Sequence, residues 1–273
     1  MPGVSFDRAA SFYDATRALP AGVTEQIRDQ LIQALGIRPD WRMLEIGVGT
    51  GRIALPFIQA GYTYWGIDIS AEMLKILQAQ QPNTPSQHVT LMRGDVMKLP
   101  LRTHSFDMLL SMHVLHLVDD WRQTLHEAMR VLRPAGWLVL LNDEHAHTDT
   151  PSAGEQVQQA WSAILDELHV PEEQRRARAV RGLDQQFVDF LHEQGLSVKR
   201  ITLLNYQKEP ISIREVVRQY QKRIFSSLWF IPDDIYAQAA QRLEGWLTTQ
   251  CAEPDTPLAR PGKIDAIIGN VKC

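Results

Sequence analysis

The sequence contains little cysteine. Its 273 residues include two cysteines, Cys251 and Cys273, and these do not form a C-x-x-C pair. Zinc sites and disulfide-stabilised scaffolds need clustered or regularly spaced cysteines, so the sequence supports neither kind of framework. This cysteine usage favours a reducing, cytoplasmic setting.

Hydrophobic runs of membrane length are also absent. No stretch approaches the 18 consecutive apolar residues of a membrane-spanning helix. The opening residues, MPGVSFDRAASFYD, have neither the basic start nor the apolar core of a secretory signal. We therefore expect a cytoplasmic protein without a membrane partner.

Basic residues are not in excess. The chain has 28 Lys and Arg against 32 Asp and Glu, a net charge of −4, and its pI is about 6.1. Proteins that grip a phosphate backbone usually carry a basic face, so this balance predicts no nucleic-acid partner. Glu172 and Glu173 precede the one basic cluster, which favours a solvated helix face. The cluster consists of Arg175, Arg176, Arg178 and Arg181.

Strand and helix patterns alternate through the first half of the chain. Short apolar runs bounded by Gly, Asp or Ser are typical of buried strands, and apolar residues at helical spacing are typical of helices. Repeated alternation predicts right-handed crossovers and a Rossmann-like α/β fold, with a mostly parallel seven-stranded sheet covered on both faces. Helices are expected at 5–35, 53–60, 70–80 and 121–132, strands at 43–46, 62–67, 89–92, 106–111 and 137–142, and a turn at 134–136.

The pattern changes beyond Asp143. Helices are expected at 152–182, 184–194 and 212–250, the last interrupted around 227–232, and residues 253–261 are the best linker candidate. We expect a single domain over residues 1–273. Within it lie a core at 41–142, helical cap or lid insertions at 150–182 and 210–258, and a terminal antiparallel strand pair at 197–207 and 263–271.

A glycine-rich turn, Glu45-Ile-Gly47-Val-Gly49-Thr-Gly51, lies between an expected strand and helix. Glycines there let the backbone turn sharply and let a ligand lie on main-chain atoms, while the following helix directs amide hydrogens toward it. A nicotinamide-binding turn needs a third small residue where this chain has Arg52. The turn therefore indicates a nucleotide-like ligand other than a nicotinamide cofactor.

Two acidic residues follow the next two strands. Asp68 lies 19 positions after Gly49, where a carboxylate can accept hydrogen bonds from both ribose hydroxyls of an adenosine. Asp95 can accept from the exocyclic amine of adenine, and Val96 can pack on its ring. Because parallel strand ends meet at one edge of a sheet, these groups should converge on one ligand.

Five segments of this region resemble, in order, the motifs of class I S-adenosylmethionine-dependent methyltransferases: LEIGVGTGR, GIDIS, RGDVMKLPL, SFDMLLSMHVLHLVDDW and VLRPAGWLVL. The resemblance is to the small-molecule and quinone-biosynthesis branch and covers residues 41–142. The opening FDRAASFYD resembles that branch's N-terminal helix. The resemblance implies methyl transfer from S-adenosylmethionine to a small-molecule acceptor, with S-adenosylhomocysteine as product. No family motif follows residue 142.

The resemblance also assigns roles to residues. Glu45 and the glycines would line the methionine end, Asp68 would hold the ribose and residues 95–96 the adenine. Residues 111–113 would lie beneath the cofactor, and Tyr13 would close over it. No metal ligand is expected. The expected cofactor-binding residues are Tyr13, Glu45, Gly47, Gly49, Gly51, Asp68, Ile69, Met73, Asp95, Val96, Ser111 and Met112.

The expected chemistry is in-line displacement, in which the protein mainly supplies proximity and alignment. A base is needed only for an acceptor that must lose a proton, and His113, after the fourth strand, is our candidate. His145 and His147 follow the fifth strand and are alternatives as a base or a metal pair. Arg17 and Arg214 are candidates for an anionic substrate, although surface solvation explains both.

The helical insertions would form a lid over the strand ends that excludes water during the reaction. Their aromatic and apolar residues either form the ceiling of an acceptor pocket or pack a small core of the insertion itself. These residues are Phe225, Leu228, Trp229, Phe230 and Tyr236.

Two other functions are compatible with the sequence. One is a module that binds S-adenosylmethionine or a related adenosine ligand without catalysis. The other is an RNA or protein methyltransferase, which the acidic balance disfavours. The sequence does not identify the acceptor. It does not identify the oligomeric state either, and we expect either a monomer or a homodimer.

Overall fold

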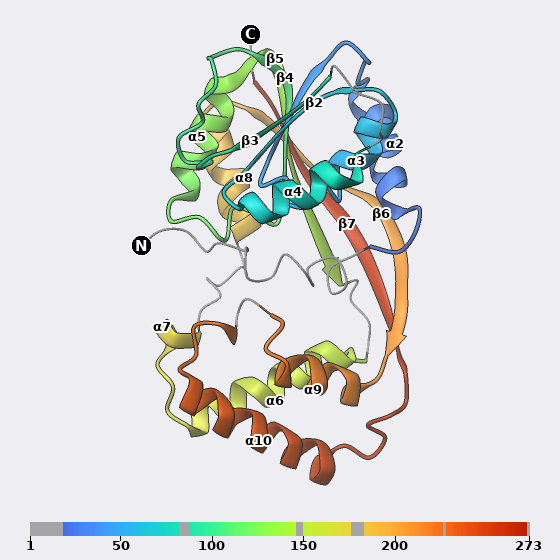
Figure 1. The fold of residues 1–273 in the computed structure, drawn as a ribbon, viewed down its shortest axis with the longest axis vertical. Helices are drawn as coiled ribbons and strands as arrows, with labels where there is room; N and C mark the ends of the chain where they lie inside the picture. Colours follow the sequence, from blue (N-terminus) through green and yellow to red (C-terminus); the bar gives the residue numbers. More distant parts are fainter. Residues whose placement is uncertain (1–18, 82–87, 146–149, 176–182, 226–227, 272–273) are drawn as a thin grey trace. The chain divides into compact units, whose positions relative to one another are not determined.

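The structure, a computed structural model, describes residues 19–81, 88–145, 150–175, 183–225 and 228–271 (Figure 1). The chain divides into two compact units, each with its own hydrophobic core. The first unit consists of Met1–Glu144, Val180–Asn205 and Lys263–Cys273, and the second of His145–Ala179 and Tyr206–Gly262.

A seven-stranded sheet has the order β3-β2-β1-β4-β5-β7-β6. The four consecutive pairs from β3 to β5 are parallel, which confirms the predicted mostly parallel Rossmann-like sheet. β1 lies inside the sheet between β2 and β4, and all its residues after Arg42 are buried. The strands are β1 (Arg42–Ile46), β2 (Thr63–Asp68), β3 (Val89–Arg93), β4 (Phe106–Met112), β5 (Leu132–His145), β6 (Ser197–Ile211) and β7 (Leu258–Asn270).

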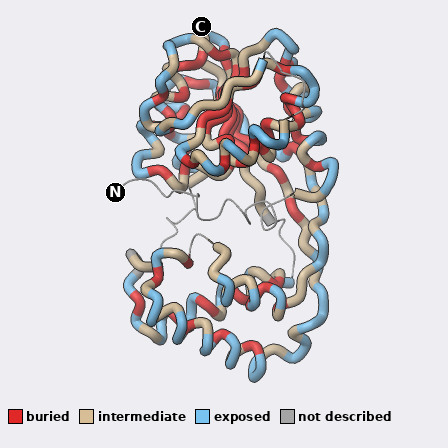
Figure 2. The backbone as a smooth tube through the Cα atoms, in the orientation of Figure 1, coloured by how far each residue is buried: buried red, intermediate tan, exposed pale blue. Residues whose placement is uncertain are grey.

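Helices of the first unit cover both faces of the sheet (Figure 1). α2 and α3 lie together on one face, and α5 and α8 lie together on the other, where Trp121 packs edge-on against Phe187 at 5.0 Å. Figure 2 shows buried residues concentrated along the strands between these helices. The helices are α2 (Val23–Leu35), α3 (Ala54–Gln59), α4 (Ala71–Gln80), α5 (Trp121–Val131) and α8 (Leu183–Glu193).

Helix boundaries follow the capping residues seen in the sequence. α2 ends at Gly36, whose left-handed conformation (φ 64°) lets its N–H donate to the carbonyl of Ile32. α4 begins after Ser70, whose hydroxyl accepts a 3.2 Å hydrogen bond from the N–H of Met73. Both of these boundaries confirm the prediction, because each depends on a local side chain or glycine. The helix predicted over 5–35 is wrong at residues 19–22, where Gly22 adopts a left-handed conformation (φ 82°) and α2 begins only at Val23.

The predicted turn at 134–136 lies within the bounds of β5, at an irregularity where the pairing of β5 with β4 shifts register. The N–H of Ala135 donates to the carbonyl of Val271, whose own N–H donates to the carbonyl of Gly136. Two residues of β5 thus face one residue after β7, and Ala135 adopts φ 62°. The backbone turns locally here, since a Cβ on Gly136 would lie 2.8 Å from the carbonyl oxygen of Arg133, and β5 then continues in the sheet.

The terminal strand pair is longer than predicted. β6 extends to Ile211, and β7 begins at Leu258, so the linker predicted at 253–261 is wrong over its last four positions. Gly262 lies within β7, next to the ring of Tyr206 on β6. A Cβ at this position would lie 2.5 Å from that ring, so a glycine fits where a larger residue would not. β6 leaves the first unit and β7 returns to it, so these neighbours run antiparallel, as predicted.

The second unit consists mainly of helices packed on a core of their own. In that core the ring of Trp161 lies 5.3 Å from Tyr220 and 5.7 Å from Tyr236. The helix predicted over 152–182 ends at Glu167, because His169 adopts a left-handed conformation (φ 50°) and the N–H of Val170 donates back to the carbonyl of Leu165. The helices are α6 (Ala153–Glu167), α7 (Glu172–Arg175), α9 (Ile213–Gln221) and α10 (Asp233–Gln250).

The aromatic and apolar residues of this unit largely pack its core. Leu228 is buried in it, and Phe225 and Tyr236 pack against it, which confirms the interpretation of an internal core for these three. The indole N–H of Trp229 donates to the carbonyl of Arg223. Phe230, by contrast, is 47% exposed. Within the described residues, no helix is long and apolar enough to cross a membrane.

Candidate functional site

The glycine turn and Asp68 meet at the ends of β1 and β2. The N–H of Gly49 donates to one carboxylate oxygen of Asp68 at 2.8 Å, and the N–H of Ser70 donates to the other at 2.8 Å. The N–H of Gly47 donates to the carbonyl of Ile67 at 2.8 Å, which ties the turn to β2. Asp68 therefore shapes the turn as well as presenting a carboxylate beside it.

The backbone of this turn leaves room for a ligand at one position. Gly47 and Gly49 have φ of 66° and 54°, where L side chains are strained. A Cβ on Gly47 would lie 2.2 Å from the side chain of Val114. A Cβ on Gly49 would meet only the carbonyl of Gly47, at 4.0 Å, so the space above Gly49 is open. Gly51 instead packs tightly on Leu77.

Glu45 is a buried carboxyl next to this turn. It is 3% exposed and accepts a 2.7 Å hydrogen bond from the hydroxyl of Tyr64, which is fully buried. Burial raises the pKa of Glu45 to about 8, although the Tyr64 hydrogen bond and the charge of Arg52 act to lower it. Burial likewise raises the pKa of Tyr64 well above its ordinary value. The sequence does not predict a role for Tyr64 in the site, because a tyrosine in an apolar strand is typical of a core residue.

The expected adenine residues follow β3. Asp95 is exposed, and one of its oxygens accepts a 2.8 Å hydrogen bond from the N–H of Met97. Val96 is 7% exposed, and Ile69, directly after Asp68, is 39% exposed. β3 neighbours β2 in the sheet, so these residues occupy the strand end adjacent to Asp68.

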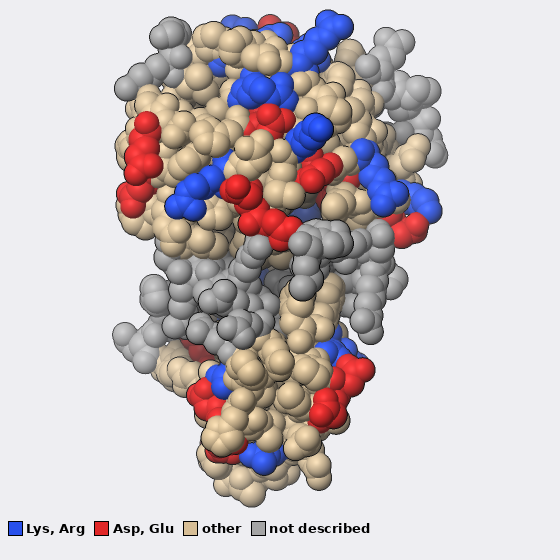
Figure 3. Space-filling model, turned by 90° about the vertical axis from the view of Figure 1, so that its left-hand side faces the viewer, with Lys and Arg blue, Asp and Glu red and all other residues tan. Residues whose placement is uncertain are grey.

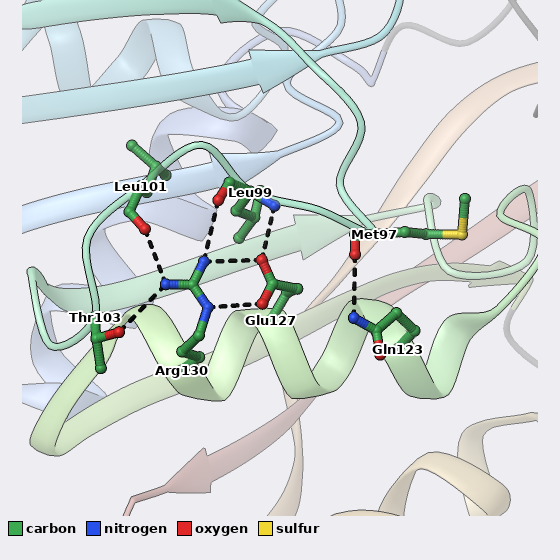
Figure 4. Close-up of polar contacts among 7 residues, drawn as sticks. All are labelled: Met97, Leu99, Leu101, Thr103, Gln123, Glu127 and Arg130. Atoms are coloured by element: carbon green, nitrogen blue, oxygen red, sulfur yellow. Dashed lines mark hydrogen bonds and ion pairs between the residues drawn. The ribbon is translucent and has the colours of Figure 1, made fainter.

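A part-buried ion pair on α5 holds the loop that carries Asp95 (Figure 4). Arg130 donates to Glu127 at 2.6 and 2.8 Å and to the carbonyls of Leu99 and Leu101 at 3.0 and 2.8 Å. Glu127 in turn accepts from the N–H of Leu99 at 2.8 Å. This hydrogen bonding to Arg130 is the main reason that the pKa of Glu127 is lowered. Sequence reasoning also missed this pair.

The end of β4 places Ser111 and Met112 in the interior, at 3% and 6% exposure. His113 follows with φ 58°, an uncommon conformation for a residue other than glycine. Its ring lies 6.3 Å from that of His116. Strained backbone of this kind occurs often at functional sites, which agrees with the choice of His113 as a candidate.

Ser111 and His113 line a cavity of about 50 Å³ within the first unit. Its polar side is a hydrogen-bonded group in which Asp184 accepts from Arg200 at 3.3 Å and from Asn142 at 3.4 Å. Burial raises the pKa of Asp184, although Arg200 acts to lower it. Its apolar side includes Leu115, Leu140, Leu183, Phe187 and Ile267. Asp184 and Arg200 come from segments without a recognisable motif.

Other predicted residues have different placements. Met73 is 3% exposed in the core of the first unit. Arg214 pairs with Asp255 at 2.6 Å, which agrees with a surface role. Among the described residues, no three His, Cys, Asp or Glu side chains are grouped so as to hold a metal ion. Tyr13, Arg17, His147 and the side chain of His145 lie outside what the structure describes.

Comparison with known proteins matches residues 44–140 to the Methyltransferase domain family. A demethylmenaquinone methyltransferase of Renibacterium salmoninarum is 32% identical over 141 residues, 51% of this chain and 57% of that protein. A malonyl-[acyl-carrier protein] O-methyltransferase of Methylococcus capsulatus is 31% identical over 174 residues, 62% of this chain and 58% of that protein. The matches thus span less than two thirds of these relatives.

Solved structures share the fold. The YcgJ protein of Bacillus subtilis superposes with a TM-score of 0.56 at 20% identity, covering 91% of this chain and 98% of that one. A phosphoethanolamine N-methyltransferase of Haemonchus contortus, in complex with S-adenosylhomocysteine, superposes with a TM-score of 0.56 at 16% identity. That match covers 98% of this chain and 58% of the other.

Proposed function

We propose that this chain, which carries over residues 44–140 a methyltransferase domain of the class I S-adenosylmethionine-dependent family, transfers a methyl group from S-adenosylmethionine to a small-molecule acceptor. One observation carries the proposal. The 2.8 Å hydrogen bond from Gly49 N–H to Asp68 joins the glycine turn and the carboxylate at adjacent strand ends. An adenosine-containing ligand needs these two features together.

The residues present fit such a ligand. The open space above Gly49 lets a ligand lie against the main chain, and Asp68 would accept from the ribose hydroxyls. Glu45 would lie at the methionine end, and Asp95 would accept from the adenine amine. The remaining predicted binding residues, Gly47, Gly51, Ile69, Met73, Val96, Ser111, Met112 and Tyr13, belong to the same proposed site.

When bound, S-adenosylmethionine supplies a methyl group already activated on a sulfonium. The chain's own contribution is to bind the acceptor in line with that methyl group and to exclude water. His113 would take a proton from an acceptor that must lose one before it attacks. Because His113 and Ser111 both line the cavity, we place the acceptor's reacting group there.

At about 50 Å³ the cavity has room for only the reacting end of an acceptor, and its lining indicates the chemistry of that end. Its walls combine Leu and Phe side chains with a polar side formed by Asn142, Asp184 and Arg200, which suits an apolar molecule with a polar group at one end. The methyltransferases reported above are named for demethylmenaquinone and malonyl-[acyl-carrier protein]. Quinol precursors and thioester-linked carboxylic acids are therefore the first acceptors to test.

We also propose the wider setting of the protein. The net charge of −4 and the mixed acidic and basic side chains on the face in Figure 3 support an acceptor other than nucleic acid. The two widely spaced cysteines support a cytoplasmic location. The second unit is proposed as a lid over the acceptor, and the protein as a monomer or homodimer.

The test is direct. Isothermal titration calorimetry should detect binding of S-adenosylmethionine and of S-adenosylhomocysteine to the purified full chain. Methyl-labelled S-adenosylmethionine is then supplied with each acceptor, and transfer of the label is followed. Binding without transfer to any small molecule would favour a non-catalytic module. A well-folded sample that binds neither nucleoside would refute the proposal.

A further inference from the structure

We propose that Glu45 is a neutral carboxylic acid before S-adenosylmethionine binds, positioned by the hydroxyl of Tyr64, and that it releases its proton to solvent on binding. The inference rests on the proposed function, because it needs that ligand's amino-acid end beside Glu45. It adds Tyr64 as a positioning residue and makes cofactor affinity depend on pH.

The geometry isolates Glu45 and Tyr64 as a pair. Glu45 of β1 is opposite Gly66 of β2, and Tyr64 is opposite Met43, so both side chains lie on the face that carries Met43. Phe57 of α3 stacks on the Tyr64 ring at 5.8 Å and covers it. Tyr64 is fully buried and donates to Glu45 at 2.7 Å. The tyrosine therefore has little freedom to move away.

The protein groups around Glu45 do not by themselves neutralise a negative charge on its carboxyl group. From β2 it is faced by the neutral Tyr64 and by the carboxylate of Asp68, which disfavours ionisation. From β4 its neighbour is the apolar Leu110. Arg52, after the turn, favours ionisation without forming an ion pair to Glu45 among the described contacts. Burial dominates these effects and raises the pKa of Glu45 to about 8.

The second carboxyl oxygen of Glu45 is open to a ligand. Tyr64 bonds to Oε2, and Oε1 has no partner among the described residues. In the part of the chain described, no fully buried side-chain polar atom lacks a hydrogen-bond partner. Oε1 therefore keeps some exposure within a residue that is 3% exposed overall, and the proposal directs it toward the methionine end of the site.

The ligand brings the missing positive charge. Below pH 7.5 the methionine end of S-adenosylmethionine carries an ammonium group, and an ammonium next to a buried carboxyl favours the ionised form. The O–H bond of Glu45 breaks, the proton passes to buffer, and the carboxylate remains paired with the ammonium. The Tyr64 hydroxyl keeps its proton and donates to the carboxylate.

The number of protons released can be measured by titration calorimetry. At pH 7.0, S-adenosylmethionine is titrated into the full chain in two buffers of different ionisation enthalpy. We expect release of close to one proton per site, and an affinity that rises toward tenfold per pH unit between pH 6.0 and 7.5. 5′-Methylthioadenosine, which lacks the amino-acid end, should bind without releasing a proton.

Variants of Glu45 and Tyr64 test whether these two residues cause the proton release. Glu45→Gln should abolish proton release and remove the pH dependence of affinity. Tyr64→Phe should move the midpoint of the pH dependence upward by about one unit, because the carboxylate loses a hydrogen bond. Tyr62→Phe is the matched control: Tyr62 packs on Phe57 at 5.6 Å, and its loss should leave the midpoint unchanged.

The outcomes separate this inference from the proposed function. If S-adenosylmethionine binds with the same proton count as 5′-methylthioadenosine, the inference is wrong and the function stands. The same holds if proton release persists in Glu45→Gln. The comparison of S-adenosylmethionine with 5′-methylthioadenosine uses the wild-type protein, so it does not depend on whether a variant folds. If neither ligand binds, the proposed function falls and this inference falls with it.

Discussion

Asp68 has two tasks at the scale of single residues, because the carboxylate that would hold the ribose also accepts from Gly49 and Ser70. We expect Asp68→Ala to weaken S-adenosylmethionine binding by at least ~1.5 kcal/mol, the scale of hydrogen bonds to charged groups. Titration calorimetry measures the loss. Asp40→Ala, a surface variant ahead of β1, is the control, and an unchanged Kd in folded Asp68→Ala would remove Asp68 from the site.

Glu45 should also make the free energy of unfolding depend on pH when no ligand is added. Its folded pKa of about 8 lies above the ordinary 4.5, so the folded state holds this proton more tightly than the unfolded state does. The resulting stability is complete below pH 4.5 and is lost as pH rises through about 8. Glu45→Gln, which cannot ionise, should therefore exceed wild type at pH 8.5 by on the order of 3 kcal/mol.

Urea unfolding at pH 4.5 and pH 8.5 measures this difference, and Glu25→Gln on the exposed side of α2 serves as its control. The advantage of Glu45→Gln should shrink toward zero at the lower pH. A constant difference at both pH values would contradict a raised pKa in the folded state.

Site residues differ in how far the sequence reveals them. Asp68 is predictable because a carboxylate at a fixed distance after a glycine turn has a local signature. Tyr64 is not, because its hydrogen bond to Glu45 depends on the register between β1 and β2. Asp184 and Arg200 are brought to the cavity by α8 and β6, and long-range pairing of this kind has no sequence signature.

Arg130 of α5 holds the loop after β3 that carries Asp95, a residue of the proposed site. Arg130→Met removes the hydrogen bonds to Leu99, Leu101 and Glu127 (Figure 4), and it leaves Glu127 part-buried without its cation. We expect a stability loss of about 1–3 kcal/mol and weaker binding of the adenosine part. Thermal unfolding and 5′-methylthioadenosine titration measure both. Arg102→Met, an exposed change in the same loop, should alter neither.

A substitution at Ala135, in the irregular part of β5, tests whether its left-handed backbone is strained. Ala135 has φ 62°, where an L side chain is strained and glycine is not. Ala135→Gly should therefore raise stability by about 0.5–1 kcal/mol. Ala128→Gly, in the buried middle of α5, should lower it instead, by at least about 1 kcal/mol. A loss of stability in both variants would mean that the left-handed backbone is not strained.

For the whole molecule, the sequence predicts the sheet better than the arrangement around it. Alternating strand and helix patterns are local, so the parallel core from β1 to β5 follows from them. The helical segments after Asp143 carry apolar faces, but a face does not specify its partner. The sequence therefore left open whether the aromatic residues there covered a pocket or each other, and the structure gives the second unit a core of its own.

Separate cores predict separate consequences of mutation. Trp161 is 5% exposed in the core of the second unit, and Trp161→Ala should cost that unit about 3–5 kcal/mol. The proposed cofactor residues of the described chain lie in the first unit. The Kd for S-adenosylhomocysteine should therefore change by no more than about twofold.

Hydrogen exchange and calorimetry distinguish two cores that unfold separately from two cores that unfold together. In Trp161→Ala, amides of α6, α9 and α10 should exchange faster while those of β1 and β2 keep their protection. Trp121→Ala is the matched variant, because Trp121 packs on Phe187 and Phe190 in the first unit, and it should weaken S-adenosylhomocysteine binding. Loss of protection throughout the chain, or a tenfold weaker Kd, would instead mean that the two cores unfold as one.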